Sequence, residues 1–260
     1  HPVFMHDDSM SLRAEAIRRL RTNLQFVDFG DRPSSIVVTS SVQGEGKTTT
    51  AVNLAASLAD AGARVILIDS DLRRPSVAKY MGYEGRVGLT TVLIGRAAVE
   101  DVVQPWQDTS LDVLPSGQIP PNPSELLGSR AMSRLLDDLA ETYDVIVLDT
   151  PPLLPVTDAA ILSKMAGGAL VVAGADRLHK QQLRSALESL EKVGAHVLGI
   201  VLNNVQRKDR DRYAYEYYSS ESPAVTQRSS RRGRGRRKAA PRAARARRAT
   251  WSDETLTTRR

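Results

Sequence analysis

Apolar positions along the chain fall into two patterns. Near the beginning, Leu12, Ala16, Leu20 and Leu24 recur every four residues, which predicts a helix over residues 11–26. Farther along, short apolar runs without polar alternation predict buried strands, and stretches of helical period separate them. The predicted strands cover residues 35–40, 64–69, 111–114, 144–149, 169–173 and 197–202, and the predicted helices cover residues 48–61, 89–94, 129–142, 158–165 and 180–193.

This alternation of strands and helices predicts the fold class. Strands that are apolar on both sides are typical of a mainly parallel sheet covered by helices on both faces. We therefore predict an α/β three-layer sandwich over residues 11–208, which follows a flexible lead-in over residues 1–10. In such sheets, ligands bind where the carboxyl ends of the strands meet.

A glycine-rich segment joins the first predicted strand to the next helix. Gly44 and Gly46 allow the backbone to curl around phosphate, Lys47 can reach the β- and γ-phosphates, and Thr48 can hold Mg²⁺. Ser41 replaces the usual first glycine, which is a minor departure from the pattern. The fold is therefore predicted to be a P-loop NTPase fold. The predicted nucleotide-binding residues of this loop are Gly44, Glu45, Gly46, Lys47, Thr48 and Thr49.

Two further apolar strands end in carboxylates. Asp69 and Asp71 close the run RVILIDSD, and Asp149 closes DVIVLD. If these strands lie beside the strand that precedes the P-loop, the three side chains converge on the phosphate end, where they can hold Mg²⁺ or accept a proton. A single aspartate at a strand end is more often a helix cap, but three beside a P-loop favour a catalytic site.

Charge divides the chain into a body and a tail. The net charge is +6, but from Arg228 onward 13 Lys or Arg residues stand against only Asp253 and Glu254. The body is therefore mildly acidic, and the high isoelectric point describes the tail. The chain has no cysteine, which excludes disulfides, thiol catalysis and cysteine-based zinc sites.

We predict that residues 223–260 form a disordered basic tail, because Arg, Ala and Gly dominate without apolar period. Such a tail can bind an anionic membrane surface, or it can be solvated without a specific partner. Specific nucleic-acid binding is disfavoured, because residues 229–248 contain no aromatic side chain that could stack on bases.

Along nearly the whole body, the sequence resembles the bacterial tyrosine kinases of capsule and exopolysaccharide synthesis. The matching segments are residues 15–26 (EAIRRLRTNLQF), 40–54, 65–75 (VILIDSDLRRP), 114–127 (LPSGQIPPNPSELL), 143–152 (YDVIVLDTPP) and 199–203 (GIVLN). The resemblance implies an ATP- and Mg²⁺-dependent kinase that phosphorylates its own tyrosines in trans.

The resemblance also implies a role for each residue of the site. Lys47 would bind phosphate, Asp71 would orient or deprotonate the acceptor tyrosine, and Asp69 and Asp149 would hold the metal together with Thr48. Asn203 would contact the adenine. Two arginines of the DLRRP segment, Arg73 and Arg74, would either stabilise phosphate charge or form structural salt bridges.

Residues 209–222 contain a tyrosine cluster. Tyr213, Tyr215, Tyr217 and Tyr218 are four of the seven tyrosines of the chain and lie in a polar, charged segment. We predict that they are the phosphoacceptors. The alternative is an adhesive loop or a terminal strand.

Three charged residues of the first long predicted helix, Glu15, Arg18 and Arg21, lie away from its apolar stripe. The resemblance implies that they form the interface of a homo-oligomer, with a ring as the expected form. The alternative is a solvated face with a weak Glu–Arg pair.

The resemblance implies a transmembrane polysaccharide co-polymerase as activator, fused upstream or on a separate chain, and a cytoplasmic location at the inner face of the plasma membrane. The competing function is a nucleotide-switched assembly ATPase of the partition or division-site type. Those ATPases typically carry an additional lysine early in the P-loop. Residues 41–43 (SVQ) contain none, which favours the kinase.

Overall fold

The computed structural model describes residues 3–26 and 34–205, which belong to the first of two compact units, residues 1–208. The second unit, residues 209–260, lies outside the described residues. The predicted tyrosine cluster and basic tail therefore stay predictions.

A single sheet forms the middle layer of the described part. Its strands are β1 (Ser35–Ser40), β2 (Val65–Asp69), β3 (Gln104–Pro105), β4 (Leu111–Leu114), β5 (Val145–Asp149), β6 (Gly168–Gly174) and β7 (Val197–Asn203). Their order is β3-β4-β2-β5-β1-β6-β7, and all neighbours are parallel except the short β3, which is antiparallel to β4. β5 thus lies between β1 and β2.

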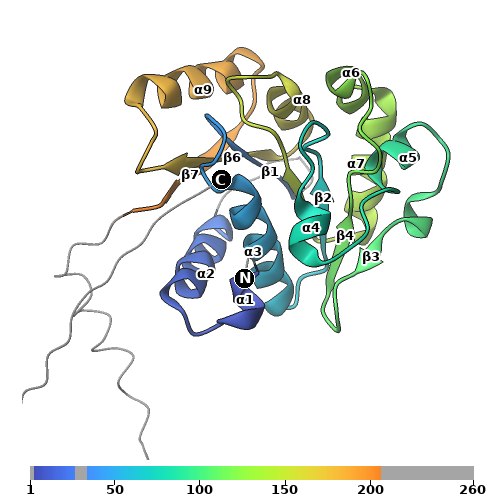
Figure 1. Ribbon diagram of the computed structural model, residues 1–260, viewed down its shortest axis with the longest axis horizontal. Helices are drawn as coiled ribbons and strands as arrows, with labels where there is room; N and C mark the ends of the chain where they lie inside the picture. Colours follow the sequence, from blue (N-terminus) through green and yellow to red (C-terminus); the bar gives the residue numbers. More distant parts are fainter. Residues whose placement is uncertain (1–2, 27–33, 206–260) are drawn as a thin grey trace, which may run out of the picture. The chain divides into compact units, whose positions relative to one another are not determined.

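Helices cover both faces of this sheet (Figure 1). The α-helices are α1 (Phe4–Asp7), α2 (Leu12–Leu24), α3 (Lys47–Asp60), α4 (Val77–Met81), α5 (Leu89–Leu93), α6 (Pro123–Leu127), α7 (Arg130–Thr142), α8 (Asp158–Met165) and α9 (Lys180–Lys192), with a 3₁₀ turn at Val99–Asp101. One core cluster joins α1–α4 to the sheet, and two others join α5–α9 to its opposite face. The predicted three-layer sandwich is confirmed.

Alternate residues of the inner strands pack against opposite helix layers. On β1, Ile36 and Val38 pack with the α3 layer, whereas Val37 packs with the α7 layer. Because both faces are buried, the strands need no polar alternation, which explains the apolar runs of the sequence.

The structure contains every predicted helix and strand, with small differences at their ends. The prediction missed α4, α6, the 3₁₀ turn and β3. The two helices have five residues each, and β3 has two. A segment of two to five residues carries little periodic signal, and of the three five-residue helices in the described ranges only α5 was predicted.

The expected flexible lead-in over residues 1–10 is corrected by the structure, which places α1 within it. Val3 and Met5 are buried against α3, and the Met5 N–H donates to Asn53 Oδ1 (3.1 Å). The His6 ring also makes an edge contact with Trp106. A single helical turn with two apolar residues leaves no periodic signal in the sequence.

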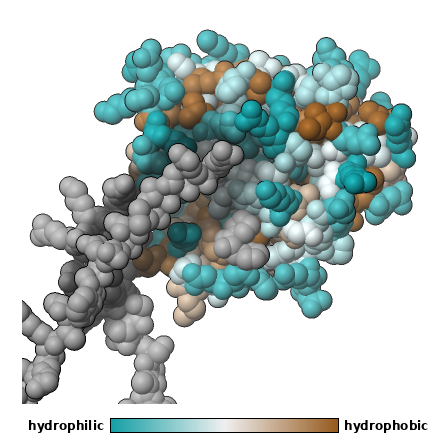
Figure 2. All heavy atoms as spheres, in the orientation of Figure 1, coloured by the Kyte–Doolittle hydropathy of each residue, from teal (hydrophilic) through white to brown (hydrophobic). Residues whose placement is uncertain are grey.

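Hydrophilic residues cover most of the visible face, and hydrophobic residues form separate patches (Figure 2). None of the helices within residues 3–26 and 34–205 is long and apolar enough to cross a membrane.

Candidate active site

The phosphate-binding loop joins β1 to α3. Gly44 and Gly46 have φ angles of 85° and 90°, in the left-handed region that glycine adopts without strain. A Cβ at Gly46 would also overlap the side-chain amide of Asn203. Because α3 begins at Lys47, its free N–H groups and the positive end of its dipole face the loop. The loop therefore has the geometry of an anion site.

Glu45 anchors this loop from inside. Its buried carboxylate accepts the N–H groups of Val42 (2.8 Å) and Gly174 (2.9 Å). Its backbone carbonyl accepts the Asn203 side-chain amide (2.9 Å). Glu45, a predicted nucleotide-binding residue, thus fixes the loop from behind: its side chain bonds the end of β6 and its carbonyl bonds the end of β7.

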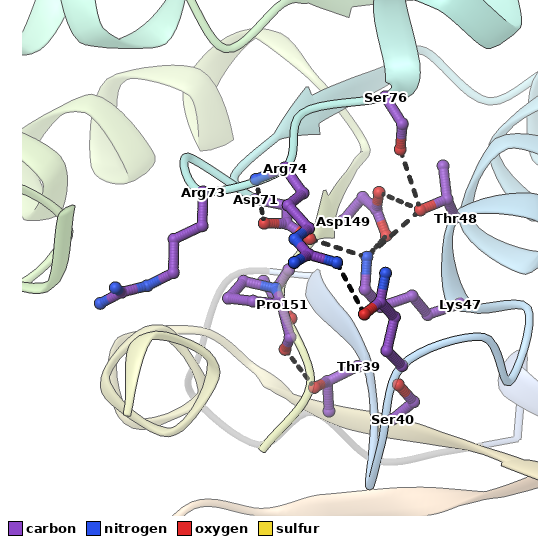
Figure 3. A network of polar contacts seen from close by, with 12 residues as sticks. Thr39, Ser40, Lys47, Thr48, Asp71, Arg73, Arg74, Ser76, Asp149 and Pro151 are labelled. Carbon is purple, nitrogen blue, oxygen red and sulfur yellow. Dashed lines mark hydrogen bonds and ion pairs between the residues drawn. The ribbon is translucent and has the colours of Figure 1, made fainter. Parts of the chain in front are cut away.

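Lys47 lies among carboxylates. Its Nζ is 3.0 Å from Asp71 Oδ2 and 3.8 Å from Asp149 Oδ1 (Figure 3). Burial alone would lower the pKa of Lys47, but the charges of Asp149 and Asp71 outweigh it and raise the pKa. The ammonium therefore stays protonated and ready to bind phosphate.

The two oxygens of Asp149 differ in their hydrogen bonding. Oδ2 accepts the Thr48 hydroxyl (2.7 Å), whereas the buried Oδ1 accepts no hydrogen bond. Burial raises the pKa of Asp149 to about 6, although Lys47 and Thr48 act to lower it. A buried carboxylate oxygen without a donor is costly unless a cation satisfies it.

Asp69 is engaged by the backbone of the following loop. Its Oδ2 accepts the N–H groups of Ser76 and Val77 (both 2.9 Å), and its Oδ1 accepts that of Asp71 (3.3 Å). Burial and the nearby Asp149 raise the pKa of Asp69 to about 7, although the two amides at the start of α4 act to lower it. This geometry is that of a loop and helix cap, so a metal role for Asp69 stays a prediction.

A cavity of about 600 Å³ opens in front of these groups. It is lined by residues of the phosphate-binding loop and α3, of the segment after β2, and of the segment after β5; these are Gln43, Gly44, Gly46, Lys47, Thr48, Thr49, Asp71, Arg73, Arg74, Ser76, Tyr80, Pro151, Pro152, Pro155 and Val156. The volume falls in the range of small-ligand sites.

The donor set fits a hard cation held jointly with phosphate. Within the described ranges, no group of three or more His, Cys, Asp or Glu side chains could hold a metal alone. Mg²⁺, however, usually binds through one or two protein oxygens, phosphates and waters. The Thr48 hydroxyl and Asp149 Oδ1, which accepts no hydrogen bond, meet that requirement.

Comparison with known proteins gives the family. Residues 34–198 match the family model described as an AAA domain. The tyrosine-protein kinase YwqD of Bacillus subtilis (strain 168) is 41% identical over 213 residues, which are 82% of this chain and 90% of YwqD. The chain belongs to the bacterial tyrosine-protein kinases.

Solved structures agree with this assignment. The chimerical protein CapA2B2 is 36% identical, with a TM-score of 0.75 over 79% of the kinase chain and 91% of the chimera. The Pyrococcus furiosus cell division ATPase MinD is 29% identical, with a lower TM-score of 0.57 over 72% of the kinase chain and 80% of MinD. The fold is shared with MinD, and the likeness is closer to the kinase domain of Escherichia coli tyrosine kinase ETK, which is 32% identical with a TM-score of 0.75 over 80% of the kinase chain and 82% of that domain.

The two arginines of the DLRRP segment point in different directions in the kinase (Figure 3). Arg73 turns away from Lys47 and forms two hydrogen bonds with the buried Asp158 (2.8 and 3.1 Å). Arg74 turns toward the phosphate-binding loop, where its Nη1 donates to Gln43 Oε1 (2.8 Å). Of the two expected roles, Arg73 forms the structural salt bridge, and Arg74 remains at the cavity.

Asn203 reaches the phosphate-binding loop, through its bond to the Glu45 carbonyl. No sequence pattern predicts this contact, because the two residues are far apart in the chain. A contact between Asn203 and adenine stays a prediction.

The predicted interface residues make contacts within the described chain. Glu15 lies near Arg18 (3.5 Å), and Arg18 donates to the Ser9 carbonyl (2.6 Å). Arg21 donates to the carbonyl of Ser57 on α3 (2.8 Å). Arg21 therefore docks α2 onto α3, whereas Glu15 is half-buried. An interface role for the three residues stays a prediction.

The sequence prediction overlooked two polar residues. Asp158 is fully buried and holds Arg73, and the Ser76 hydroxyl lies 3.4 Å from that of Thr48. The sequence indicated Asp158 only as a residue in the first turn of a predicted helix, and it contained no pattern that pointed to Ser76. Both contacts join segments that only the fold brings together.

Proposed function

We propose that the kinase uses ATP and Mg²⁺ to phosphorylate its own tyrosines. One observation carries this proposal: the Asp71 carboxylate lines the cavity beside the phosphate-binding loop and is held at both oxygens. Oδ2 accepts from Lys47, and Oδ1 accepts the Arg74 N–H (3.0 Å). A carboxylate fixed next to the γ-phosphate position can orient a hydroxyl and take its proton.

The loop and Lys47 would bind the nucleotide. The N–H groups from Gly44 to Thr48 would surround the phosphates, and Lys47 would move from Asp71 to the β- and γ-phosphates. This transfer leaves Asp71 free as a base. When bound, Mg²⁺ neutralises phosphate charge, and Thr48 and Asp149 are the residues that would hold it.

Phosphoryl transfer then needs only a positioned acceptor. The tyrosine oxygen attacks the γ-phosphorus, the bond from that phosphorus to the bridging oxygen of ADP breaks, and Asp71 accepts the phenolic proton. Tyr213, Tyr215, Tyr217 and Tyr218 are the proposed acceptors, presented by a second copy of the chain. A tyrosine hydroxyl has an ordinary pKa of about 10, so a nearby base assists the attack.

The biological setting is proposed from the family. We place the kinase in the cytoplasm at the inner face of the plasma membrane, as a homo-oligomer that regulates exopolysaccharide or capsule polymerisation and export. Its activator would be a transmembrane polysaccharide co-polymerase. The basic tail would bind anionic lipid, and deletion of residues 229–260 should then reduce liposome binding at low salt.

Mass spectrometry after incubation with Mg²⁺-ATP tests the proposal. Phosphate should appear on the tyrosines of residues 213–218. Asp71→Asn should lower the rate by about 10²-fold or more while nucleotide still binds. Asp60→Asn, at the exposed far end of α3, is the matched control. Accumulation of ADP without phosphotyrosine would instead support the assembly ATPase.

The expected oligomer can be tested by light scattering before and after phosphorylation. Phosphate adds about −1.5 to −2 charge to each tyrosine, and several within six residues repel one another and the acidic body. The mass should therefore fall on phosphorylation. An unchanged mass at full phosphorylation would contradict this part of the proposal.

A further inference from the structure

The cavity has an apolar wall that phosphate binding does not need. Pro151, Pro152, Pro155 and Val156, which follow β5, form this wall. It is fixed to the end of β1, because the Thr39 hydroxyl donates to the Pro151 carbonyl (2.9 Å) and the Leu153 N–H donates to that of Ser40 (2.8 Å). A rigid, proline-rich wall next to a polar centre fits the ring of a substrate rather than its phosphate.

Arg74 supplies an uncommitted positive charge on the same cavity. Arg73 is neutralised by Asp158, but the guanidinium of Arg74 has only the neutral amide of Gln43 as hydrogen-bond partner within the described part of the chain. No carboxylate of residues 3–26 or 34–205 forms an ion pair with Arg74. Its guanidinium is therefore available to an anionic ligand.

The position of Arg74 links that ligand to the catalytic carboxylate. The Arg74 N–H holds Asp71 Oδ1 (3.0 Å), and both residues line the cavity together with Pro151 (Figure 3). An acceptor hydroxyl at Asp71, with its ring against the proline wall, would place neighbouring residues of the acceptor chain near Arg74. In an extended chain, one or two residues correspond to about 3–7 Å.

The acceptor sequence of this chain is negative on balance, since residues 209–222 contain four acidic residues and two arginines. Glu216 adjoins both Tyr215 and Tyr217, and Asp211 lies two residues before Tyr213. We propose that the proline wall and Arg74 form an acceptor subsite that selects a tyrosine flanked by an acidic or phosphorylated residue. This inference rests on the proposed kinase function. It implies that each phosphotyrosine favours the phosphorylation of a neighbouring tyrosine.

The competing role for Arg74 is contact with the nucleotide phosphates. The two roles differ in what a substitution changes. Loss of an acceptor contact alters discrimination between peptides, whereas loss of a phosphate contact alters the KM for ATP equally with every peptide.

The experiment uses the full chain with Tyr213, Tyr215, Tyr217 and Tyr218 replaced by Phe, so that only added peptides accept phosphate. The peptides carry the sequence of residues 209–222 with Tyr215 as sole acceptor and Phe at the other tyrosines. One keeps Glu216, one carries Glu216→Gln, and one carries Glu216→Gln with phosphotyrosine at 217. Steady-state rates are compared for three enzymes on this background: one that keeps Arg74, one with Arg74→Gln and one with Arg74→Lys. Arg86→Gln, on an exposed surface pair, is the control.

With Arg74 present, kcat/KM should be about three- to five-fold higher for the peptide that keeps Glu216 than for the peptide with Glu216→Gln alone, the size expected of a rim ion pair. For the phosphorylated peptide, kcat/KM should be about ten-fold higher than for the peptide with Glu216→Gln alone. Arg74→Gln should bring both ratios near one with the KM for ATP unchanged. Arg74→Lys should restore part of the preference, and Arg86→Gln should keep all of it.

Equal rates on the three peptides with Arg74 present would overturn the inference and leave the kinase function intact. A raised KM for ATP in Arg74→Gln, with the peptide ratios kept, would assign Arg74 to the nucleotide and also overturn the inference. Failure of the unaltered chain to phosphorylate its own tyrosines, while also leaving every peptide unmodified, would overturn the function itself.

Discussion

Asp149 is the residue whose environment most strongly indicates a cation-binding site. Its buried Oδ1 has no hydrogen-bond donor, although Lys47 and Thr48 lie close by. A buried carboxylate oxygen without a hydrogen-bond donor is costly, and Lys47, at 3.8 Å, is too far from it to donate a hydrogen bond. The binding of metal and nucleotide should therefore depend on this oxygen.

Asp149→Asn should abolish the stabilisation that Mg²⁺ adds to nucleotide binding. At a hundred times the dissociation constant, a ligand stabilises by about 2.7 kcal/mol, which corresponds to a Tm increase of about 5–10 °C. The unaltered chain should show such an increase with Mg²⁺-ADP, and the variant should show the same small response with Mg²⁺ or EDTA. A full Mg²⁺-dependent increase in the variant would contradict the assignment of this oxygen.

The pH dependence of the ligand-free chain follows from the raised pKa values of Asp69 (about 7) and Asp149 (about 6), against about 3.8 for an ordinary aspartate. Groups whose pKa is higher in the folded state bind protons more readily there. Their contribution to stability is complete below pH 4 and is lost as pH rises through 6 and 7. Urea unfolding without nucleotide or divalent cation should give a lower free energy at pH 8 than at pH 5.

The matched control for this pH dependence is Asp149→Asn. Removal of one of the two groups should make the change between pH 5 and pH 8 smaller. A free energy that rises over this range in the unaltered chain, or an identical slope in the variant, would show that other groups dominate.

Among the elements, the loop after β2 is held from two sides. The Asp69 carboxylate accepts backbone N–H groups of this loop. Arg73 ties the loop to Asp158 at the start of α8 and to Ser124 on α6. The segments DLRRP and PPNPSELL, which the sequence singled out separately, therefore meet in space. Their pairing keeps Asp71 at a fixed place beside the cavity.

Arg73→Ala should destabilise the fold by about 2–4 kcal/mol, since it leaves the buried Asp158 without its cation. The adjacent Arg74→Ala should cost less than about 0.5 kcal/mol, because among the described residues the Arg74 side chain forms a hydrogen bond only with Gln43. Urea denaturation of the two variants measures this difference. Similar losses would mean that Arg73 is not the structural member of the pair.

Sequence patterns predicted those parts of the site that depend on local rules. Strand-end carboxylates converge in a parallel sheet, so Asp71 and Asp149 could be placed near Lys47 from the sequence alone. Contacts that depend on tertiary packing could not be predicted. The Arg73–Asp158 pair spans 85 residues, and nothing in the local sequence distinguishes Arg73 from Arg74.

For the molecule as a whole, the N-terminal helices are part of the folded domain. Met5 and Ile17 are buried in the cluster around α3, and Arg21 bonds the Ser57 carbonyl. The sequence suggested a flexible start followed by an interface helix. The described contacts show that α1 and α2 also stabilise the single chain.

Arg21→Ala should therefore lower the free energy of unfolding of the single chain by about 1–2 kcal/mol, through loss of its hydrogen bonds to α3. Arg19→Ala, in an exposed pair with Glu15, should cost less than about 0.5 kcal/mol. Unfolding is measured in dilute solution at several protein concentrations. A loss for Arg21→Ala that disappears on dilution would assign the residue to an interface alone.

The contacts that hold the phosphate-binding loop also determine when, during synthesis of the chain, the nucleotide site can form. Glu45 lies early in the sequence, but the side chain that holds its carbonyl, Asn203, follows 158 residues later. A growing chain cannot complete its nucleotide site until β7 has formed, and such distant pairings form late. Nascent chains that end before Asn203 should bind nucleotide poorly. The nucleotide site thus becomes complete only after the chain has been made through β7.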